Sequence, residues 1–224
     1  MARTHRRPPT LAVAAAALVS GLLLRGCIPT DRSDGATPAT APLSAASVEP
    51  GPATVEAGIP RGFGHSEAGA QAAATQFVRT GQALLDLDPL AASDAVTAMA
   101  ATATATTQAR ALTDQLAQLR DSLAGGTGPI SYWQAALAIR TVSYSDATAQ
   151  IAVWNVGVLS RAGAAPPQAG WATSTLTLVW ERDDWRVLSE SIVPGPAPIP
   201  NDAAAPASAE VLTAALRDFV PTSK

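Results

Sequence analysis

The chain has 224 residues and a mass of 22.7 kDa, a length that suits one domain with additional terminal segments. Its 15 basic and 18 acidic residues give a formal charge of −3, which excludes the basic footprint of a nucleic-acid-binding protein. A single cysteine excludes an internal disulfide framework, and the two histidines argue against a zinc site.

Residues 1–27 have the features of an export or anchoring segment. Arg3, Arg6 and Arg7 precede an apolar run of 14 residues that extends from Leu11 to Leu24. That length matches the hydrophobic region of a signal peptide and is shorter than the roughly 20 residues of a transmembrane helix.

The apolar run is followed by the only cysteine. The sequence Leu24-x-Gly26-Cys27 resembles a bacterial lipobox, in which the cysteine is lipidated and becomes the new N-terminus, although Arg25 departs from that pattern. An uncleaved anchor and cleavage with release are the alternatives. All three place the rest of the chain outside the cytoplasm, and we expect a protein anchored at the cell membrane.

The part of the chain after residue 27 is acidic. It carries 11 basic and 18 acidic residues, a formal charge of −7. Anionic lipid head groups and nucleic acid would repel such a surface. We therefore expect the N-terminal segment to hold the protein at the membrane, where its partners are proteins of the membrane or cell wall.

The composition divides the remainder into three parts. Residues 28–57 are rich in Pro, Ala, Ser and Thr and predict a disordered linker. Residues 58–193 contain the regular hydrophobic patterns of a folded domain. Residues 194–224 predict a Pro-rich connector and a short amphipathic helix at about Ser208–Phe219.

Three helices are expected at the start of the domain. The first covers about Ser66–Leu85, with Ser66 as its N-cap. The second begins with Asp88 as the cap and Pro89 in the first turn, and ends near Ala100. The third covers about Thr107–Leu123, where leucines recur on one face.

From Ile130 onward the hydrophobic period changes to two, which predicts four strands. The first contains Trp133, Leu137 and Ile139, and the second is apolar on both faces. A loop rich in Pro and Gly is expected at 161–170. The last two strands form a hairpin around the tight turn Arg182-Asp183-Asp184.

Helices followed by a meander of strands predict an α+β fold, with N-terminal helices packed on a curved antiparallel sheet of about four strands and a short C-terminal helix. This order resembles the cone-shaped fold of nuclear transport factor 2 and, within it, the extracytoplasmic domains of inner-membrane scaffold subunits of conjugation and type IV secretion machines. The segments GIPRGFGHSEAGA (58–70) and DWRV (184–187) resemble uncharacterised actinobacterial membrane-associated proteins. These scaffold domains are not enzymes, so the resemblance implies no catalytic residue.

No catalytic, cofactor-binding or metal-binding residues are predicted. His65 lies beside Ser66 at a helix start, where neighbouring side chains point apart, and no nucleophile motif surrounds them. Asp86 and Asp88 fit a helix end and an N-cap, because no calcium-binding loop follows them.

All five tryptophans lie in the strand half of the domain, at 133, 154, 171, 180 and 185. Packing in the core explains most of them, and we expect Trp180 and Trp185 to be largely buried beside the last turn. Trp154 and Trp171 are the candidates for a ligand or partner surface, because Trp154 lies opposite the Ile151 and Val153 face of its strand and Trp171 follows a loop.

These observations favour a non-catalytic, membrane-tethered extracytoplasmic interaction domain. The resemblance suggests a narrower form of this hypothesis, an accessory or scaffold of a conjugation or secretion machine. One alternative is a lipoprotein that binds a small apolar ligand or peptide in a cone-shaped pocket. Another is an enzyme that uses the same pocket, for which Tyr132 and Tyr144 are available.

The lipid anchor can be tested directly. If Cys27 is lipidated, metabolic labelling with an alkyne fatty acid will tag the protein, and Cys27→Ala will abolish the tag. Retention in the membrane without any tag would instead identify an uncleaved anchor.

Overall fold

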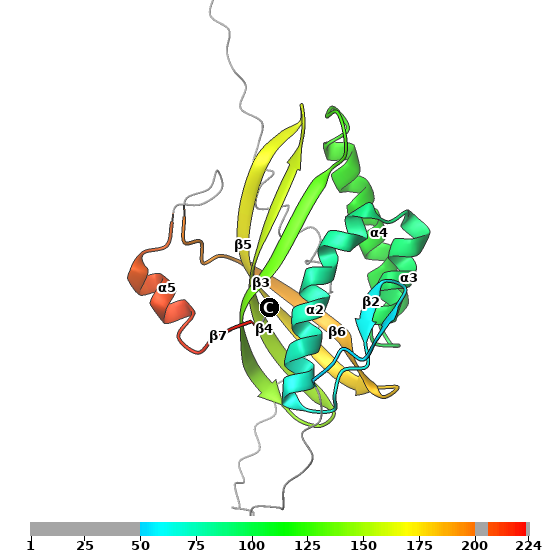
Figure 1. Cartoon of the computed structure of the whole chain (residues 1–224), viewed down its shortest axis with the longest axis vertical. Coiled ribbons are helices and arrows are strands. Elements are labelled where there is room, and N and C mark those ends of the chain that lie inside the picture. Colours follow the sequence, from blue (N-terminus) through cyan, green and yellow to red (C-terminus); the bar gives the residue numbers. More distant parts are fainter. Residues whose placement is uncertain (1–49, 200–205, 223–224) are drawn as a thin grey trace, which may run out of the picture.

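The computed structural model describes residues 50–199 and 206–222, which form an α+β domain (Figure 1). Its helices are α2 (Glu67–Asp86), α3 (Pro89–Met99), α4 (Ala105–Ser122) and α5 (Ala209–Ala215). Its strands are β1 (Thr54–Glu56), β2 (Ile59–Arg61), β3 (Ser131–Tyr144), β4 (Thr148–Arg161), β5 (Ala165–Glu181), β6 (Asp184–Pro194) and β7 (Val220–Pro221). The predicted signal or anchor segment 1–27, with Cys27, lies outside the described residues.

The predicted fold class is wrong. Among the described residues the main sheet has five antiparallel strands in the order β6-β5-β4-β3-β7, and β1 and β2 form a separate two-stranded sheet. The expectation of a four-stranded, nuclear-transport-factor-2-like cone missed three of these strands. Each of the three is only two or three residues long, which is too short for an alternating hydrophobic pattern to reveal.

The helix starts agree with their predicted caps. The Ser66 hydroxyl accepts a hydrogen bond from the amide of Gly69 (3.1 Å) at the start of α2. The Asp88 carboxylate accepts from the amides of Leu90 (2.9 Å) and Ala91 (3.0 Å) at the start of α3. These bonds satisfy amides that have no partner within the helix, so local sequence determines where both helices begin.

The expected loop at 161–170 is wrong, because β5 begins at Ala165 and continues through Pro166 and Pro167. In this part β5 lies at the edge of the sheet, since β6 pairs only with residues 172–181. Its register with β4 also shifts between Leu159 and Arg161, next to the two prolines. A strand edge and a register shift are places that tolerate residues without an N–H.

The folded domain begins before the predicted boundary at residue 58. Thr54–Glu56, which the sequence placed in the disordered linker, form β1 and pair with β2. The turn between them is Ala57-Gly58, both with positive φ (50° and 78°), the backbone shape that joins tight hairpins. At the other end, β7 follows α5 and pairs with Ala138 and Ile139 of β3, so the C-terminal segment is part of the sheet.

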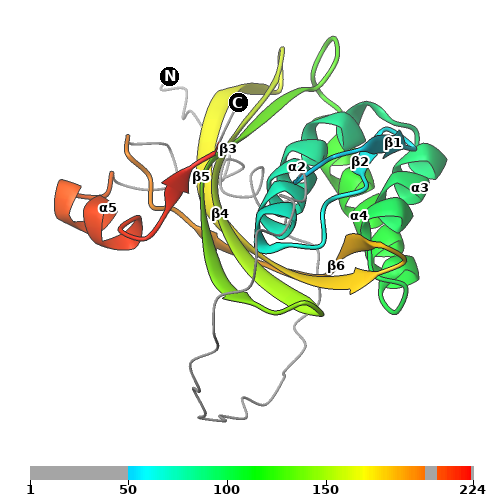
Figure 2. The same ribbon diagram turned by 60° about the horizontal axis from the view of Figure 1, so that its bottom comes forward.

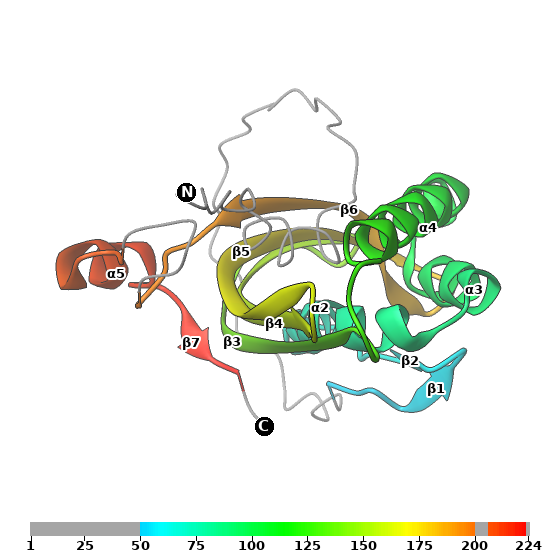
Figure 3. The same ribbon diagram turned by 90° about the horizontal axis from the view of Figure 1, so that it is seen from above.

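The long strands curl around helix α2, with α3 and α4 beyond it, whereas α5 lies on the opposite side of the sheet (Figures 2 and 3). We call the face toward α2 and α4 the inner face and the other the outer face. The core lies between the inner face and the helices, and includes Phe77 and Leu84 of α2, Leu116 and Leu119 of α4 and Ile151 of β4. The outer face is only partly covered.

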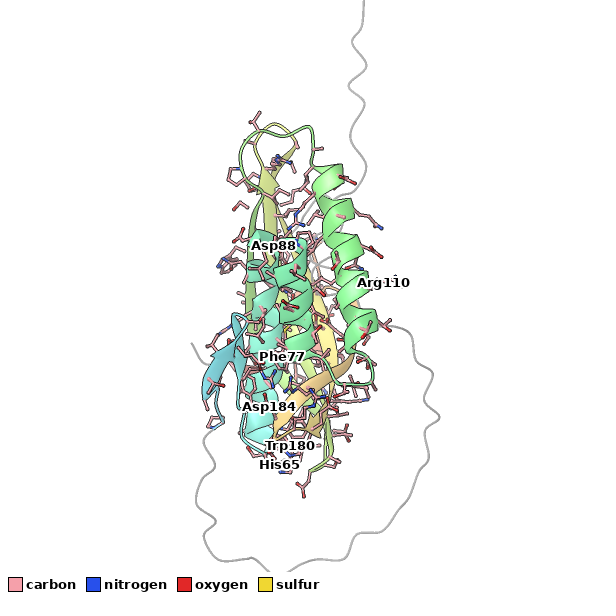
Figure 4. The ribbon with its side chains drawn as sticks, turned by 90° about the vertical axis from the view of Figure 1, so that its right-hand side faces the viewer. His65, Phe77, Asp88, Arg110, Trp180 and Asp184 are labelled. Atoms are coloured by element: carbon pink, nitrogen blue, oxygen red, sulfur yellow. The ribbon has the colours of Figure 1, made fainter. Side chains whose placement is uncertain are left out.

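The last hairpin is fixed to the start of the domain by the Asp184 carboxylate (Figure 4). It accepts hydrogen bonds from Arg61 Nε (2.6 Å) and from the amides of Gly62 (3.2 Å), Phe63 (3.0 Å) and Trp185 (2.9 Å). Both ion-pair partners are nearly inaccessible, with side-chain exposures of 8% for Arg61 and 3% for Asp184. The chain leading into α2 is therefore bound to the turn between β5 and β6.

Of the two tryptophans beside this turn, Trp185 is fully buried, as expected. Its indole Nε1 donates to the carbonyl of Gly64 at 3.0 Å. Trp180 is half-buried. One of its faces is covered by the His65 ring, which is itself exposed, with ring centroids 4.0 Å apart and planes nearly parallel at 5°. Trp185 is thus a residue of the core, and Trp180 is partly buried and packs against that core.

The role of Asp184 can be measured with two neighbouring variants. We expect Asp184→Asn to lower the free energy of unfolding by about 3 kcal/mol, because it removes the buried counter-charge of Arg61 and leaves the guanidinium only the exposed Glu56 carboxylate, 3.4 Å away. The control is Asp183→Asn, since Asp183 is exposed and asparagine tolerates its positive φ. Urea unfolding of both variants provides the comparison, and equal stabilities would contradict a structural role for the ion pair.

Candidate functional site

The two tryptophans predicted to form a partner surface lie on the outer face. Directly opposed residues in an antiparallel sheet share a face. Trp154 of β4 opposes Thr173 of β5, and Trp171 of β5 opposes Val156 of β4, so the two indoles are in neighbouring rows on one side of the sheet. The core residues Ile151 and Val153 point to the other side, as the sequence predicts.

The connector after β6 crosses this face beside both residues. The Trp154 indole Nε1 donates to the carbonyl of Pro196 (3.1 Å), and the Trp171 carbonyl accepts from the amide of Gly195 (2.7 Å). Ala197 is buried here, with 7% of its surface exposed. Trp154 and Trp171 are consequently half-buried, and the connector already occupies part of the surface around them.

A third tryptophan, Trp133, belongs to the same face and was missed by the sequence reasoning. It opposes Val158 on β4 and is 51% exposed, which makes it the most accessible of these large rings. The sequence grouped it with Ile139 in one alternating pattern, but the register shifts between Ala136 and Ala138. This bulge moves Ile139 to the inner face, and no residue in the strand signals it.

The inner face carries a row of polar side chains, one from each of four strands, that was also not predicted. Gln134 Nε2 donates to Asn155 Oδ1 (3.3 Å), Asn155 Nδ2 donates to Ser174 Oγ (3.2 Å), and Ser174 is near enough to the Glu190 carboxyl to lower its pKa, against the larger effect of burial. Asn155 and Ser174 are fully buried and Gln134 is 4% exposed. We call Gln134, Asn155, Ser174 and Glu190 the polar row.

Tyr132 lies next to the polar row and is 6% exposed. Its hydroxyl and the Oε1 atom of Glu190 are both shielded from solvent and lack a hydrogen-bond partner in residues 50–199 and 206–222. Burial raises the pKa of Glu190 to about 8, and burial together with the Glu190 charge raises the pKa of Tyr132. A Cβ at Gly157 would lie 2.8 Å from the Tyr132 hydroxyl, so glycine is required there.

The sequence gives one indication of the polar row, which is the position of its members in the apolar alternation of their strands. Asn155 follows Ile151 and Val153 at inward positions, and Ser174 precedes Leu176 and Leu178 in the same way. A polar residue that continues an apolar alternation predicts a buried polar group. The side chains come together only through strand register, which a single sequence does not show.

Residues 33–207 match a family described as a domain of unknown function, DUF8175. This match covers more than half of the chain. The chain belongs to the DUF8175 family. No curated protein matches this DUF8175 chain. A solved structure, the crystal structure of the intermembrane space region of the chloroplast protein ARC6, is similar at 13% identity and a TM-score of 0.29, over 40% of this chain and 71% of that one.

His65 and the acidic side chains, which the sequence analysis considered for catalysis or metal binding, can now be placed in the DUF8175 domain. His65 stacks on Trp180, and its Nε2 lies 2.6 Å from the carbonyl oxygen of Asp146. Within the described ranges, no three His, Cys, Asp or Glu side chains are grouped so that they could hold a metal ion. Over the same ranges no helix combines the length and the apolarity needed to cross a membrane.

Two surface hollows of the DUF8175 domain have volumes of about 530 and 360 Å³. One is lined by residues 160–167 at the tip of the β4–β5 hairpin, and the other lies along α2 between Ala68 and Arg79 and reaches Ile139 and Thr222. Neither hollow includes Trp154 or Trp171 in its lining.

Stability should depend on pH through Glu190. The folded state retains a proton up to about pH 8, whereas the unfolded state releases it above the ordinary pKa of 4.5. The unfolded state therefore binds fewer protons in this window, and the free energy of unfolding falls as pH rises from 5 to 9, on the order of a few kcal/mol. Urea titrations will show this slope in the wild type, and Glu190→Gln will remove it. An exposed control, Glu210→Gln, should keep the slope, and an unchanged slope in Glu190→Gln would contradict the assignment.

Proposed function

We propose that this DUF8175 protein is a non-catalytic interaction domain, tethered at the cell membrane by its N-terminal segment and located outside the cytoplasm. In this proposal a protein partner docks on the outer face of the sheet. The observation that carries it is the arrangement of Trp133, Trp154 and Trp171 in three successive rows of that face.

Several exposed apolar side chains extend this surface. Val193 of β6 opposes Thr173, in the row that contains Trp154, and is 64% exposed. Trp133 at 51% contributes a large flat ring at the β3 side of the same face. Tryptophan is enriched among the residues that dominate protein–protein binding energy, whereas Thr173 and similar neighbours supply the surrounding polar contacts.

The charge of the molecule supports tethering through the N-terminus. The chain after residue 27 carries a formal charge of −7, so its surface is not attracted to anionic lipids. The apolar run Leu11–Leu24 and Cys27 are the parts of the sequence that suit membrane attachment. An accessory role in a conjugation or secretion machine is the narrower form of the proposal, and partner identification tests it.

The docking surface can be tested in cells with a photo-crosslinking amino acid at Ala135, which shares the outer face with Trp133. We expect one discrete adduct, and Trp133→Ala should reduce its yield at least tenfold because an interface tryptophan typically contributes about 2 kcal/mol or more. Gel analysis of the adduct and mass spectrometry of the partner are the measurements.

The matched control places the same crosslinker at Leu90 of α3. Like Trp133, Leu90 is a large exposed apolar residue (73% exposed), but it lies on another surface of the domain. It should give no adduct. Thermal unfolding of Trp133→Ala should stay within a few degrees of the wild type, because the ring is half in solvent. An adduct from Leu90 alone, or one unaffected by Trp133→Ala, would refute the outer face as the docking site.

A further inference from the structure

The C-terminal residues Asp218–Thr222, which we call the edge segment, lie along the outer edge of β3. Their strand part, β7, pairs antiparallel with the middle of β3. Thr222 adds two hydrogen bonds to the same edge, from its amide to the carbonyl of Leu137 (3.1 Å) and from its hydroxyl to the carbonyl of Ala136 (2.7 Å). The chain thus already shows that this edge accepts an extended segment.

Arg140 of β3 contacts the start of the edge segment. Its guanidinium carbon lies 5.1 Å from the centre of the Phe219 ring, and its Nη1 lies 4.0 Å from the Asp218 carboxylate. The second distance is longer than a hydrogen bond. Arg140 Nε is shielded from solvent and has no hydrogen-bond partner among the described residues. The edge segment therefore leaves this guanidinium incompletely paired, although one carboxylate can accept from two of its N–H groups.

The edge segment is attached to the sheet without entering the core. No residue in 206–222 is buried. Val220 is 54% exposed, and the side chain of Asp218 is 70% exposed. A segment that buries so little apolar surface opens locally at a low cost in free energy. Another strand can therefore replace it on β3 without unfolding the domain.

We propose that this edge of β3 is a strand-addition site for a partner protein, and that the edge segment is its internal occupant. The partner presents an extended segment with a carboxylate and an aromatic ring beside Arg140, followed by an aliphatic residue and a hydroxyl residue. This chemistry follows from the contacts that the edge segment makes at the same place. Main-chain pairing with a sheet edge is a recurrent mode of peptide recognition.

The surroundings offer contacts on both sides of the edge. The hollow of about 360 Å³ along α2 reaches Ile139 and Thr222, so it lies beside the edge on its inner side. On the outer side, Ala138 directly opposes Trp154, so the site adjoins the outer face. Side chains of an added strand alternate between these two sides, and such neighbouring surfaces give strand addition its specificity.

A second copy of the chain suits this edge less well than a different protein does. Two β3 strands from two copies cannot pair along their middle, because each already carries its own β7 there. Two copies also repel one another, since each has a formal charge of −7 after residue 27. An exchange of edge segments between two copies remains as the alternative occupant, and the experiment separates it.

The experiment is an NMR titration of the purified full-length chain with a synthetic peptide of residues 216–224, LRDFVPTSK. The tethered edge segment competes with the peptide at a high effective concentration. The titration is therefore repeated with the variant Phe219→Ala/Thr222→Ala, which weakens the edge segment and changes no buried residue. We expect the peptide to bind this variant roughly tenfold more tightly than the wild type, with shift changes in the middle of β3.

Two altered peptides test the chemistry of the site. Asp218→Lys in the peptide should lower its affinity roughly fivefold, because a lysine repels Arg140 where the carboxylate attracts it. The matched control peptide carries Arg217→Lys, which keeps the charge next to that position, and should bind like the original. Absence of saturable binding to the variant, or equal binding of the Asp218→Lys peptide, would overturn the proposal.

A photo-crosslinking amino acid at Val142 of β3, which is 49% exposed, tests the partner in cells. Phe219→Ala/Thr222→Ala should raise the yield of an adduct with a different protein at least threefold. An unchanged yield would overturn the proposal, as would an adduct whose mass identifies a second copy. The existence of a protein partner rests on the proposed function, but Trp133→Ala should leave the peptide affinity unchanged, so that docking on the outer face and strand addition can fail separately.

Discussion

The Asp184 carboxylate is the contact on which the arrangement of helices and sheet depends. It lies at the turn of the last hairpin, yet three of its four hydrogen-bond donors come from Arg61, Gly62 and Phe63, more than a hundred residues earlier. These residues lead directly into α2. The contact therefore fixes the position of α2 on the sheet, and it encloses Trp185, whose indole is bonded to the same segment through Gly64.

Features encoded in a few adjacent residues could be predicted from the sequence. Ser66 and Asp88 mark helix starts because an N-cap acts within three residues. Strands of two or three residues gave no such signal, and β7 exists only because Val220 and Pro221 meet Ile139 and Ala138 in space. Pairing of that kind depends on tertiary contacts that a single sequence does not display.

The same difference, between features encoded by adjacent residues and features that depend on strand pairing, applies to the candidate surfaces. Trp154 was identified because alternation places it opposite core residues, and Trp171 because it was expected to follow a loop; the sheet register places both on the outer face. Trp133 was missed because one bulge reverses the alternation within β3. The polar row was missed because Gln134, Asn155, Ser174 and Glu190 are far apart in the sequence and become neighbours only when four strands pair.

The prolines at 166 and 167 have a consequence for the behaviour of the molecule in solution. They lie in the part of β5 that extends past its pairing with β6. An uncovered strand edge is a template on which another chain can pair through its backbone. Because proline has no N–H to offer, these two residues protect the long β4–β5 hairpin from recruiting further copies. This part of the β4–β5 hairpin is thus a poorer template for backbone pairing with another chain than a strand without proline would be.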